Sequence, residues 1–344
     1  MMANLADETV LVAVVTYNSA RLIKEFVASL DPGFAGVKYE LVAADNNSDD
    51  DTIDVLHKYA PSAKLIEMGR NAGYAAGINA AVANASQHTA VLAVNPDVRL
   101  GPGCIPELLR ELRTPGTGIA VPRLADGRGE LLETMRREPT IARAFGDVFL
   151  GSRRAGRWPR FGEVVTDPRL YVEKSVVDWA EGSMQLISAE CWVRCGAWDE
   201  SYFLYSEETD YDLRARDLGF NVRFVPSAHA THLKGELSSS PKLWSLLTMN
   251  RVRLFRRRNG LIATALYWLA CLVREATRSF LGYRTSRAAF RALVAQPLLA
   301  VQSVWTGTVR GGVGSEQPTS CVHRLSDKNN EGRNRDKHDH SRTQ

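Results

Sequence analysis

The sequence predicts an α/β protein with a doubly wound, mostly parallel sheet flanked by helices, followed by a basic helical extension. Apolar runs and amphipathic segments alternate in the order βαβαβαβ over residues 10–94, which is the pattern of a parallel sheet with crossover helices. Each apolar run ends in polar residues, as strands do at the ligand-binding edge of such sheets. Residues 241–310 then hold twelve Lys or Arg and one Glu.

The first part of the chain supplies four strands and three helices. Apolar runs predict strands at residues 10–15, 41–44, 63–68 and 90–94. The last of these is apolar throughout, as in strands that are buried on both faces. Apolar and small residues predict helices at residues 22–30, 52–59 and 74–85. We expect Asp31-Pro32-Gly33 to stop the first helix and Pro96 to end the fourth strand.

The pattern is less regular between residues 103 and 240. We predict helices at residues 105–112 and 189–195, and strands at residues 119–122, 176–179, 184–187 and 222–225. Residues 135–169 are irregular and rich in Arg, which fits either a mobile loop over a site or an ordinary solvated loop. Ser206 is the expected N-cap of a further helix that ends at Gly219.

Composition places the chain among globular proteins. It has 344 residues and a net charge of +4, with a basic C-terminal block set against an acidic body. The five cysteines fit no zinc-binding spacing, which favours a reducing compartment, and the N-terminus has no pattern of a secretory signal. We therefore expect a cytoplasmic protein.

Polar residues at the strand ends indicate a nucleotide site. Asn18, Asp45 and Asn47 are placed to contact a base and ribose, while Arg70 and the backbone at Gly73 are placed to meet phosphate. After the fourth strand, Asp97 is placed to hold a cation such as Mg²⁺ on a diphosphate. A plain Asx-type turn explains that corner equally well on local grounds.

Acidic residues crowd the start of the helix after Ser206. Glu207, Glu208 and Asp210 complement the positive end of a helix dipole, and that role alone explains a first turn of acids. The stretch from Asp199 to Asp212 holds more carboxylates than capping needs, and like charges move pKa values apart, as catalysis requires. His232 follows a predicted strand and suits either metal ligation or a structural role.

The basic block at residues 241–310 predicts amphipathic helices. Its longest apolar run, residues 261–273, is too short to span a bilayer. Basic amphipathic helices lie on anionic membranes, and packing on the body with a solvated basic face is the alternative. No nucleic-acid-binding motif accompanies the charge, so we expect no nucleic-acid partner. Residues 311–344 are polar and are expected to be disordered.

Six motifs in this order resemble glycosyltransferase family 2, and most closely its rhamnosyltransferase-like branch. They are Val-Thr-Tyr-Asn at 15–18, Ala-Asp-Asn-Asn-Ser at 44–48, Asn-Ala-Gly-Tyr-Ala-Ala-Gly-Ile-Asn at 71–79, Asn-Pro-Asp at 95–97, Glu-Glu-Thr-Asp-Tyr-Asp-Leu-Arg at 207–214 and His-Leu-Lys-Gly at 232–235. The resemblance covers residues 8–260. It implies a GT-A fold and the inverting transfer of a sugar to a hydroxyl of a lipid-linked or cell-surface glycan. The resemblance to the rhamnosyltransferase-like branch implies that the sugar is rhamnose and the donor dTDP-rhamnose.

The resemblance also implies domains and roles for residues. Residues 1–240 would form the GT-A domain, with a nucleotide-sugar half at 1–102 and an acceptor half at 103–240. Glu208 resembles the catalytic base, with Glu207 and Asp210 beside it, and Asp97 and His232 resemble ligands of Mg²⁺ or Mn²⁺. The implied donor-binding residues are Thr16, Tyr17, Asn18, Asp45, Asn47, Arg70, Asn71, Gly73, Asn79 and Asn95.

Two departures from the family pattern bear on these roles. Asn95 stands where the family has the first acid of its Asp-x-Asp motif, so a cation would depend more on the diphosphate and on His232. Glu208 stands where the family has Asp, which lengthens the base by one methylene. A polyprenyl-diphosphate-linked acceptor on an anionic membrane surface matches the basic block. Donors such as UDP-galactofuranose, GDP-mannose and UDP-N-acetylglucosamine, or a non-catalytic nucleotide-sugar-binding scaffold, remain alternatives.

Overall fold

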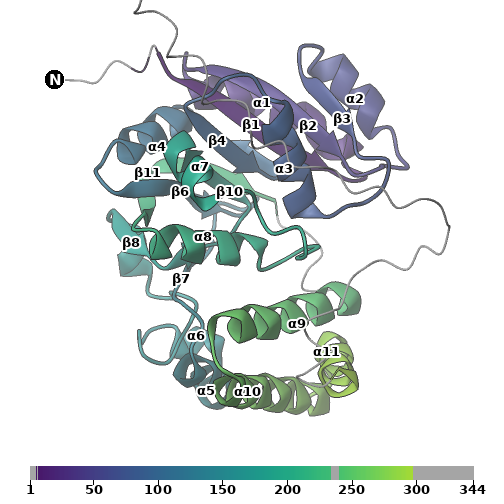
Figure 1. Cartoon of the computed structure of the whole chain (residues 1–344), viewed down its shortest axis with the longest axis vertical. Coiled ribbons are helices and arrows are strands. Elements are labelled where there is room, and N and C mark those ends of the chain that lie inside the picture. The colour runs from purple at the N-terminus through teal and green to yellow at the C-terminus, as the bar shows by residue number, and fades with distance from the viewer. Residues whose placement is uncertain (1–4, 6, 234–239, 297–344) are drawn as a thin grey trace, which may run out of the picture. The chain divides into compact units, whose positions relative to one another are not determined.

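The structure, a computed structural model, describes residue 5 and residues 7–233 and 240–296 (Figure 1). The tail at 311–344, the end of the basic block and the Lys234-Gly235 part of the last motif lie outside these residues.

A nine-stranded mixed sheet forms the centre of the described residues, in the order β3-β2-β1-β4-β10-β6-β11-β5, with β8 paired to β11. Its N-terminal half is parallel throughout and consists of β1 (Thr9–Thr16), β2 (Lys38–Asp45), β3 (Lys64–Glu67) and β4 (Ala90–Val94). The other strands are β5 (Val98–Leu100), β6 (Thr117–Ala125), β8 (Ser175–Val177), β10 (Met184–Ser188) and β11 (Asn221–His232). Strand β10 runs antiparallel to β4 and β6, and β6 and β11 are parallel. A two-stranded sheet pairs β7 (Met135–Arg136) with β9 (Trp179–Ala180).

Helices cover both faces of the sheet because its central strands are apolar on both. In β1, Val10, Val12 and Val14 join one core cluster, while Leu11, Ala13 and Val15 join the other. The first cluster includes residues of α1 (Ala20–Phe34), α2 (Thr52–Tyr59) and α4 (Cys104–Leu112). The second includes residues of α3 (Tyr74–Asn84), α7 (Ala189–Cys195) and α8 (Glu207–Asp217).

A third core cluster joins helices from two distant parts of the chain (Figure 1). Helix α5 (Ile141–Leu150), followed by the short α6 (Ser152–Ala155), packs with α9 (Pro241–Arg258), α10 (Leu261–Phe280) and α11 (Arg284–Ala295). The stacked rings of Phe255 and Tyr267, 4.1 Å between centroids, lie in this core. Within the described part of the chain, no helix combines the length and apolarity that a bilayer crossing needs.

Two local predictions are wrong, and the prediction for Ser206 is confirmed only in its position, as the N-cap residue of α8. Helix α1 passes through Pro32 to Phe34, because burial of Leu30 and Phe34 outweighs one lost backbone hydrogen bond in the last turn. The segment at 135–169 is not a continuous loop, because the apolar face of α5 has a partner in α10. The side chain of Ser206 does not cap α8, since its backbone is left-handed, with φ of 73°.

Candidate active site

A cavity of about 700 Å³ lies at the C-terminal edge of the parallel strands. Nine of the residues proposed from the sequence line it: Thr16, Tyr17, Asn71, Gly73, Asn95, Asp97, Glu207, Glu208 and His232. They come from the ends of β1, β4 and β11 and from the starts of α3 and α8. The topology therefore gathers motifs that are up to about two hundred residues apart in the chain, as expected for a site at a sheet edge.

Strand pairing places Asp97 beside His232. Val98, at the start of β5, pairs antiparallel with His232, and the backbone N–H of Leu233 donates to the carbonyl of Asp97 at 3.0 Å. This register leaves 3.2 Å between Asp97 Oδ2 and His232 Nε2, and 3.8 Å between His232 Nδ1 and Glu181 Oε1. Asp97 and His232 thus form a contacting oxygen and nitrogen pair in the lining of the cavity.

The two glutamates at the start of α8 lie in an environment that favours their protonated forms. Glu207 is only 3 % exposed, and its Oε2 has no hydrogen-bond partner among the described residues. Burial, followed by the charge of Glu208, raises the pKa of Glu207 well above the usual range of a glutamate. Burial raises the pKa of Glu208 to about 7, and the charge of Glu181 adds to the rise. A carboxylate with a pKa near 7 suits a general base.

A strained turn presents these glutamates to the cavity. Tyr205 and Ser206 both have positive φ, 71° and 73°, which is costly for residues with a Cβ and recurs at functional sites. The side chain of Asn250 on α9 donates from Nδ2 to the carbonyls of Leu204 at 2.9 Å and Tyr205 at 3.1 Å. Helix α9 therefore supports the turn that aims Glu207 and Glu208.

A buried aspartate, Asp212, holds α8 against the residues on either side of the 181–183 turn. Asp212 Oδ2 accepts from the backbone N–H of Ala180 at 2.9 Å and from Gln185 Nε2 at 3.1 Å. These bonds tie α8 to the 181–183 turn that lines the cavity. Gly182 belongs to this turn, and a Cβ there would stand 2.9 Å from the Cβ of Glu208. The turn can approach the base only because residue 182 has no side chain.

The backbone around Phe203 approaches the start of α3 so closely that residue 73 must be glycine. Gly73 has φ of 93°, and a Cβ at this position would lie 2.2 Å from the carbonyl oxygen of Phe203. The next residue, Tyr74, donates its N–H to the same oxygen at 3.0 Å. Burial, and then the charges of Glu207, Glu208 and Asp97, raise the pKa of the Tyr74 hydroxyl well above its ordinary value. Tyr74 therefore stays a neutral phenol among three carboxylates.

The end of β2 is organised by hydrogen bonds around a buried acid. Asp45, 1 % exposed, accepts from Thr16 Oγ1 at 2.7 Å, Ser48 N at 2.8 Å and Ser48 Oγ at 2.6 Å. The neighbouring Asn46 lines the cavity, while Asn47 points to an exposed position with a left-handed backbone. Asn46 Nδ2 donates to the carbonyl of Gly73 at 3.1 Å, and so connects this strand end to the start of α3.

Six of the proposed residues do not line the cavity: Asn18, Asp45, Asn47, Arg70, Asn79 and Asp210. Asn79 instead bonds the backbone of Trp198 in both directions and Glu200 Oε1, each at 2.9 Å. Asp210 accepts from Arg214 Nε at 2.8 Å, within α8. Arg70 is exposed.

Several residues that line the cavity were not proposed from the sequence, among them Tyr74, Glu181, Ser183, Leu243 and Trp244. Tyr74 and Glu181 adjoin motifs that had been singled out, so their position in the chain was a usable signal. Trp244 lies near the start of the basic block, and no local pattern connects it with Glu207 and Glu208, which precede it by 36 or more residues. Its position follows only from the packing of α9.

The charge of the cavity bears on the kind of ligand that it accepts. Four of its described lining residues are carboxylates, Asp97, Glu181, Glu207 and Glu208, and none is Lys or Arg. A diphosphate entering this cavity needs a cation to offset the repulsion. The described residues hold no cluster of three or more His, Cys, Asp or Glu fit for a metal. The Asp97–His232 pair fits instead a cation that shares its coordination with substrate phosphates and water, as Mg²⁺ commonly does.

Comparisons with known proteins identify the family of the chain. The profile of the family described as Glycosyl transferase family 2 matches residues 11–170. An N-acetylglucosaminyl-diphospho-decaprenol L-rhamnosyltransferase of Mycobacterium tuberculosis is 30 % identical over 236 residues, which is 65 % of this chain and 75 % of that protein. The low-salt glycan biosynthesis hexosyltransferase Agl10 of Haloferax volcanii is 26 % identical over 64 % of this chain and 66 % of its own length.

Among solved structures, the mannosyltransferase PcManGT of Pyrobaculum calidifontis, in complex with GDP-Man and Mn²⁺, has a similar fold. The TM-score is 0.51 at 14 % identity, over 86 % of each chain.

Proposed function

The chain belongs to glycosyltransferase family 2 and is a glycosyltransferase of GT-A fold, and we propose that it transfers rhamnose to a hydroxyl of a lipid-linked glycan. The proposed donor is dTDP-rhamnose. The observation that carries the proposal is one cavity that holds the Asp97–His232 pair together with the two proton-retaining glutamates of α8. A donor diphosphate and an acceptor hydroxyl each find a suitable partner there.

The proposed reaction is a direct displacement with inversion. Glu208, as carboxylate, accepts the proton of the acceptor hydroxyl while the oxygen attacks the anomeric carbon, and the bond to the diphosphate breaks. Glu207 stays protonated beside it, so that only one of the two glutamates carries charge. The turn at 181–183 and the strained turn at 205–206 hold the base in place.

Asp97 and His232 are the residues that would hold Mg²⁺ or Mn²⁺ on the donor diphosphate. The cation would stabilise the charge that grows on the leaving group. Asn95 contributes no charge, so the protein alone binds the ion weakly and the donor brings it in. The Mn²⁺ complex of the mannosyltransferase with a similar fold is consistent with this role.

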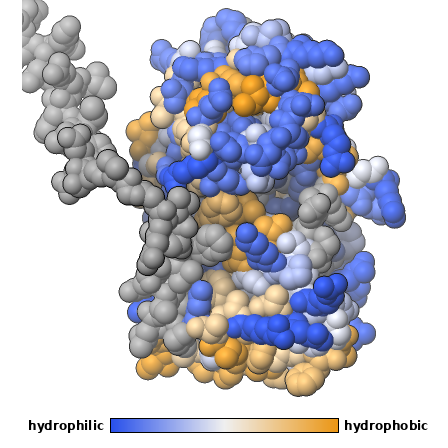
Figure 2. All heavy atoms as spheres, turned by 90° about the vertical axis from the view of Figure 1, so that its right-hand side faces the viewer, coloured by the Kyte–Doolittle hydropathy of each residue, from blue (hydrophilic) through white to orange (hydrophobic). Residues whose placement is uncertain are grey.

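The name of the mycobacterial relative supports a lipid-diphosphate acceptor, since that protein acts on an N-acetylglucosaminyl-diphospho-decaprenol. A peripheral position on the cytoplasmic side of an anionic membrane follows if the acceptor is anchored there. The surface of α10 supports this position, because Ile262, Leu266, Leu269, Val273 and Phe280 form one exposed apolar stripe. Figure 2 shows apolar residues at the lower end of the molecule, where Figure 1 draws α10.

A thermal-shift screen tests the donor half of the proposal. Nucleoside diphosphates and their sugars are added to the protein with Mg²⁺, Mn²⁺ or EDTA, because a ligand of the native state raises the Tm. We expect dTDP-rhamnose with a divalent cation to give the largest shift, and Asp97→Asn to abolish the effect of the cation. A larger shift with UDP-galactofuranose, GDP-mannose or UDP-N-acetylglucosamine would reassign the donor. A donor that binds without transfer to any acceptor would favour the scaffold alternative.

A further inference from the structure

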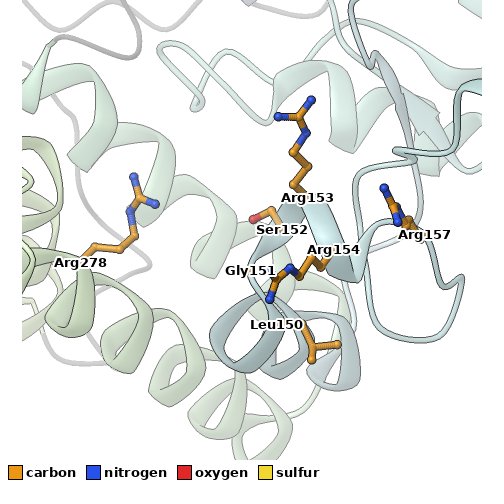
Figure 3. Close-up of a pocket in the computed structure, with 7 residues that line it drawn as sticks. All are labelled: Leu150, Gly151, Ser152, Arg153, Arg154, Arg157 and Arg278. Atoms are coloured by element: carbon orange, nitrogen blue, oxygen red, sulfur yellow. The ribbon is translucent and has the colours of Figure 1, made fainter.

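A second cavity, of about 560 Å³, lies outside the candidate active site and is strongly basic. It is lined by Leu150, Gly151, Ser152, Arg153, Arg154, Arg157 and Arg278, and we call it the arginine cavity (Figure 3). Figure 3 shows three of its arginines on α6 and the turn after it, while Arg278 stands apart from them on α10. Two segments more than a hundred residues apart thus place their guanidinium groups around one space.

The arginines of α6 and of the turn after it form no ion pair within the described part of the chain. Elsewhere Arg214, Arg216 and Arg258 pair with carboxylates, whereas Arg153, Arg154 and Arg157 form no ion pair with a described residue. Asp167 is near enough to Arg157 for the positive charge to help lower its pKa, but its Oδ2 already accepts from Arg169 Nη2 at 2.8 Å. Several unpaired guanidinium groups around one cavity repel one another and favour an anion between them. Phosphate groups match the paired N–H donors of Arg.

One side chain connects the arginine cavity with the active site. The guanidinium of Arg278 lies 6.0 Å from the ring centroid of Trp244, and its Nε donates to Ser286 Oγ at 3.1 Å. Trp244 lines the active-site cavity, and its Nε1 donates to Glu275 Oε2 at 3.0 Å. Arg278 lines one cavity and Trp244 the other, so an anionic group bound at Arg278 lies next to a side chain of the active-site cavity.

Exposed apolar side chains adjoin the arginine cavity. Leu150 lines it and is 41 % exposed, and the preceding Phe149 is 77 % exposed at the end of α5. Large apolar groups this open to solvent beside unpaired arginines suit a ligand, or a surface, that is anionic and apolar at once.

We propose that the arginine cavity binds the diphosphate of a lipid-linked sugar acceptor, with the lipid on the side of Leu150 and the sugar directed past Trp244 to Glu208. This inference rests on the proposed function for the direction of the sugar. Binding of the prenyl diphosphate itself does not depend on catalysis, so it can be tested separately. Free anionic lipid headgroups offer the same phosphate chemistry, and the tests distinguish them from the acceptor.

The first test is calorimetric titration of the full chain with farnesyl diphosphate, with farnesol as the uncharged probe. EDTA is present so that the Asp97–His232 site holds no cation. Arg153→Gln/Arg154→Gln should weaken binding of farnesyl diphosphate by about tenfold or more, because two charge-assisted contacts are lost. Arg287→Gln/Arg291→Gln is the matched control, since it removes the same charge from exposed positions of α11. Unchanged binding in the first variant, or equal weakening in both, would overturn the proposal.

The second test measures transfer to two acceptors that carry the same sugar, one on farnesyl diphosphate and one on a neutral octyl chain. Arg153→Gln/Arg154→Gln should raise KM about tenfold for the diphosphate acceptor only, with kcat and donor KM retained. Equal effects on both acceptors would contradict a diphosphate site. If neither the unchanged protein nor the variants transfer sugar, but farnesyl diphosphate still binds, the proposed function is contradicted. The proposal that the arginine cavity binds a diphosphate would still stand.

The third test asks whether the cavity binds the headgroups of free anionic lipids instead of the acceptor. It measures flotation of the protein with phosphatidylcholine vesicles that contain or lack phosphatidylglycerol. We expect both double variants to lose a similar, small part of their binding to anionic vesicles. If the Arg153/Arg154 variant loses vesicle binding selectively while it keeps farnesyl diphosphate binding, the cavity serves bulk lipid and the acceptor assignment fails.

Discussion

Glu207 and Glu208 adjoin in the chain, share one corner of the cavity and both hold protons more tightly than a free glutamate. Burial is the main cause for each, and like charge adds to it. The positive end of α8 does not cancel this effect, although it faces both side chains. A protonated Glu207 therefore leaves Glu208 as the group that exchanges its proton near neutral pH.

The first prediction concerns the pH profile of transfer. Because a base acts only when it is deprotonated, kcat/KM should rise with pH through about 7 and then level off. Glu208→Gln should lower kcat by about 10²–10⁴-fold and leave donor affinity within a factor of about two. Glu208→Asp should keep part of the activity and the pH-dependent rise. Near wild-type turnover in Glu208→Gln would place the base elsewhere.

The second prediction concerns the stability cost of Glu207. Its folded pKa is raised, so above pH 4.5 the unfolded chain releases a proton that the native state keeps. Stability is then lost as pH rises above 4.5, and a residue that cannot ionise avoids the loss. Glu207→Gln should gain stability relative to the unchanged protein as pH rises from 4 to 8, measured by urea unfolding. The exposed Glu173→Gln is the control, and the same pH trend in both would refute the assignment.

At the scale of elements, the site depends on α9 as much as on the sheet. Helix α9 lines the cavity through Leu243 and Trp244 and supports the strained turn at Tyr205 and Ser206 through Asn250. Two positive φ values in succession cost about 2–6 kcal/mol together, and surrounding contacts must hold them. Helix α9, the first part of the basic block, therefore belongs to the architecture of the proposed active site, whether or not the block also contacts a membrane.

The third prediction tests this support. Asn250→Ala removes both side-chain hydrogen bonds to the turn, which should cost about 1–3 kcal/mol of stability. It should also lower kcat more than donor affinity, because the turn positions the base and not the nucleotide. Asn259→Ala removes a comparable bond, from Nδ2 to the carbonyl of Phe255 at 2.9 Å, at the other end of α9. If both variants lose kcat equally at permissive temperature, Asn250 is only structural.

At the scale of the whole molecule, charge and hydrophobicity are divided between two regions. The active-site cavity is acidic, and the helical group around α10 carries the basic residues and the exposed apolar stripe. The stripe residues are separated by three, four or seven positions, so they share one face of α10. This division suits an enzyme whose acidic cavity accepts a donor diphosphate together with a cation and whose helices approach an anionic surface.

The fourth prediction is that the stripe supports membrane recruitment. Ile262→Ser/Phe280→Ser removes its two most exposed side chains, which are 81 % and 93 % exposed. Loss of about 2 kcal/mol of apolar burial should reduce flotation with anionic vesicles by more than tenfold and leave the Tm unchanged. Val172→Ser/Val193→Ser is the control, at positions that are 68 % and 79 % exposed and lie outside the stripe. Equal flotation of the two variants would exclude the stripe.

The sequence by itself determined the elements and the residues at the sheet edge. The strands and helices over residues 10–94 agree with prediction to within a few residues, because alternating apolar runs and turn residues are local signals. Asp97, His232, Glu207 and Glu208 were all selected from strand ends, a helix start and short motifs. A parallel sheet collects its strand ends at one edge, so the chain order already implied that several of these residues meet.

Only the tertiary structure decided which side chains enter the cavity and which do not. Asn79 and Asp210 belong to the same motifs as cavity residues, but each bonds a neighbour away from the site. Trp244 and Asn250 reach the site through packing of α9, and the helix at 141–150 forms because α10 covers its apolar face. Such contacts join residues far apart in the chain and depend on side-chain direction, which no local pattern encodes.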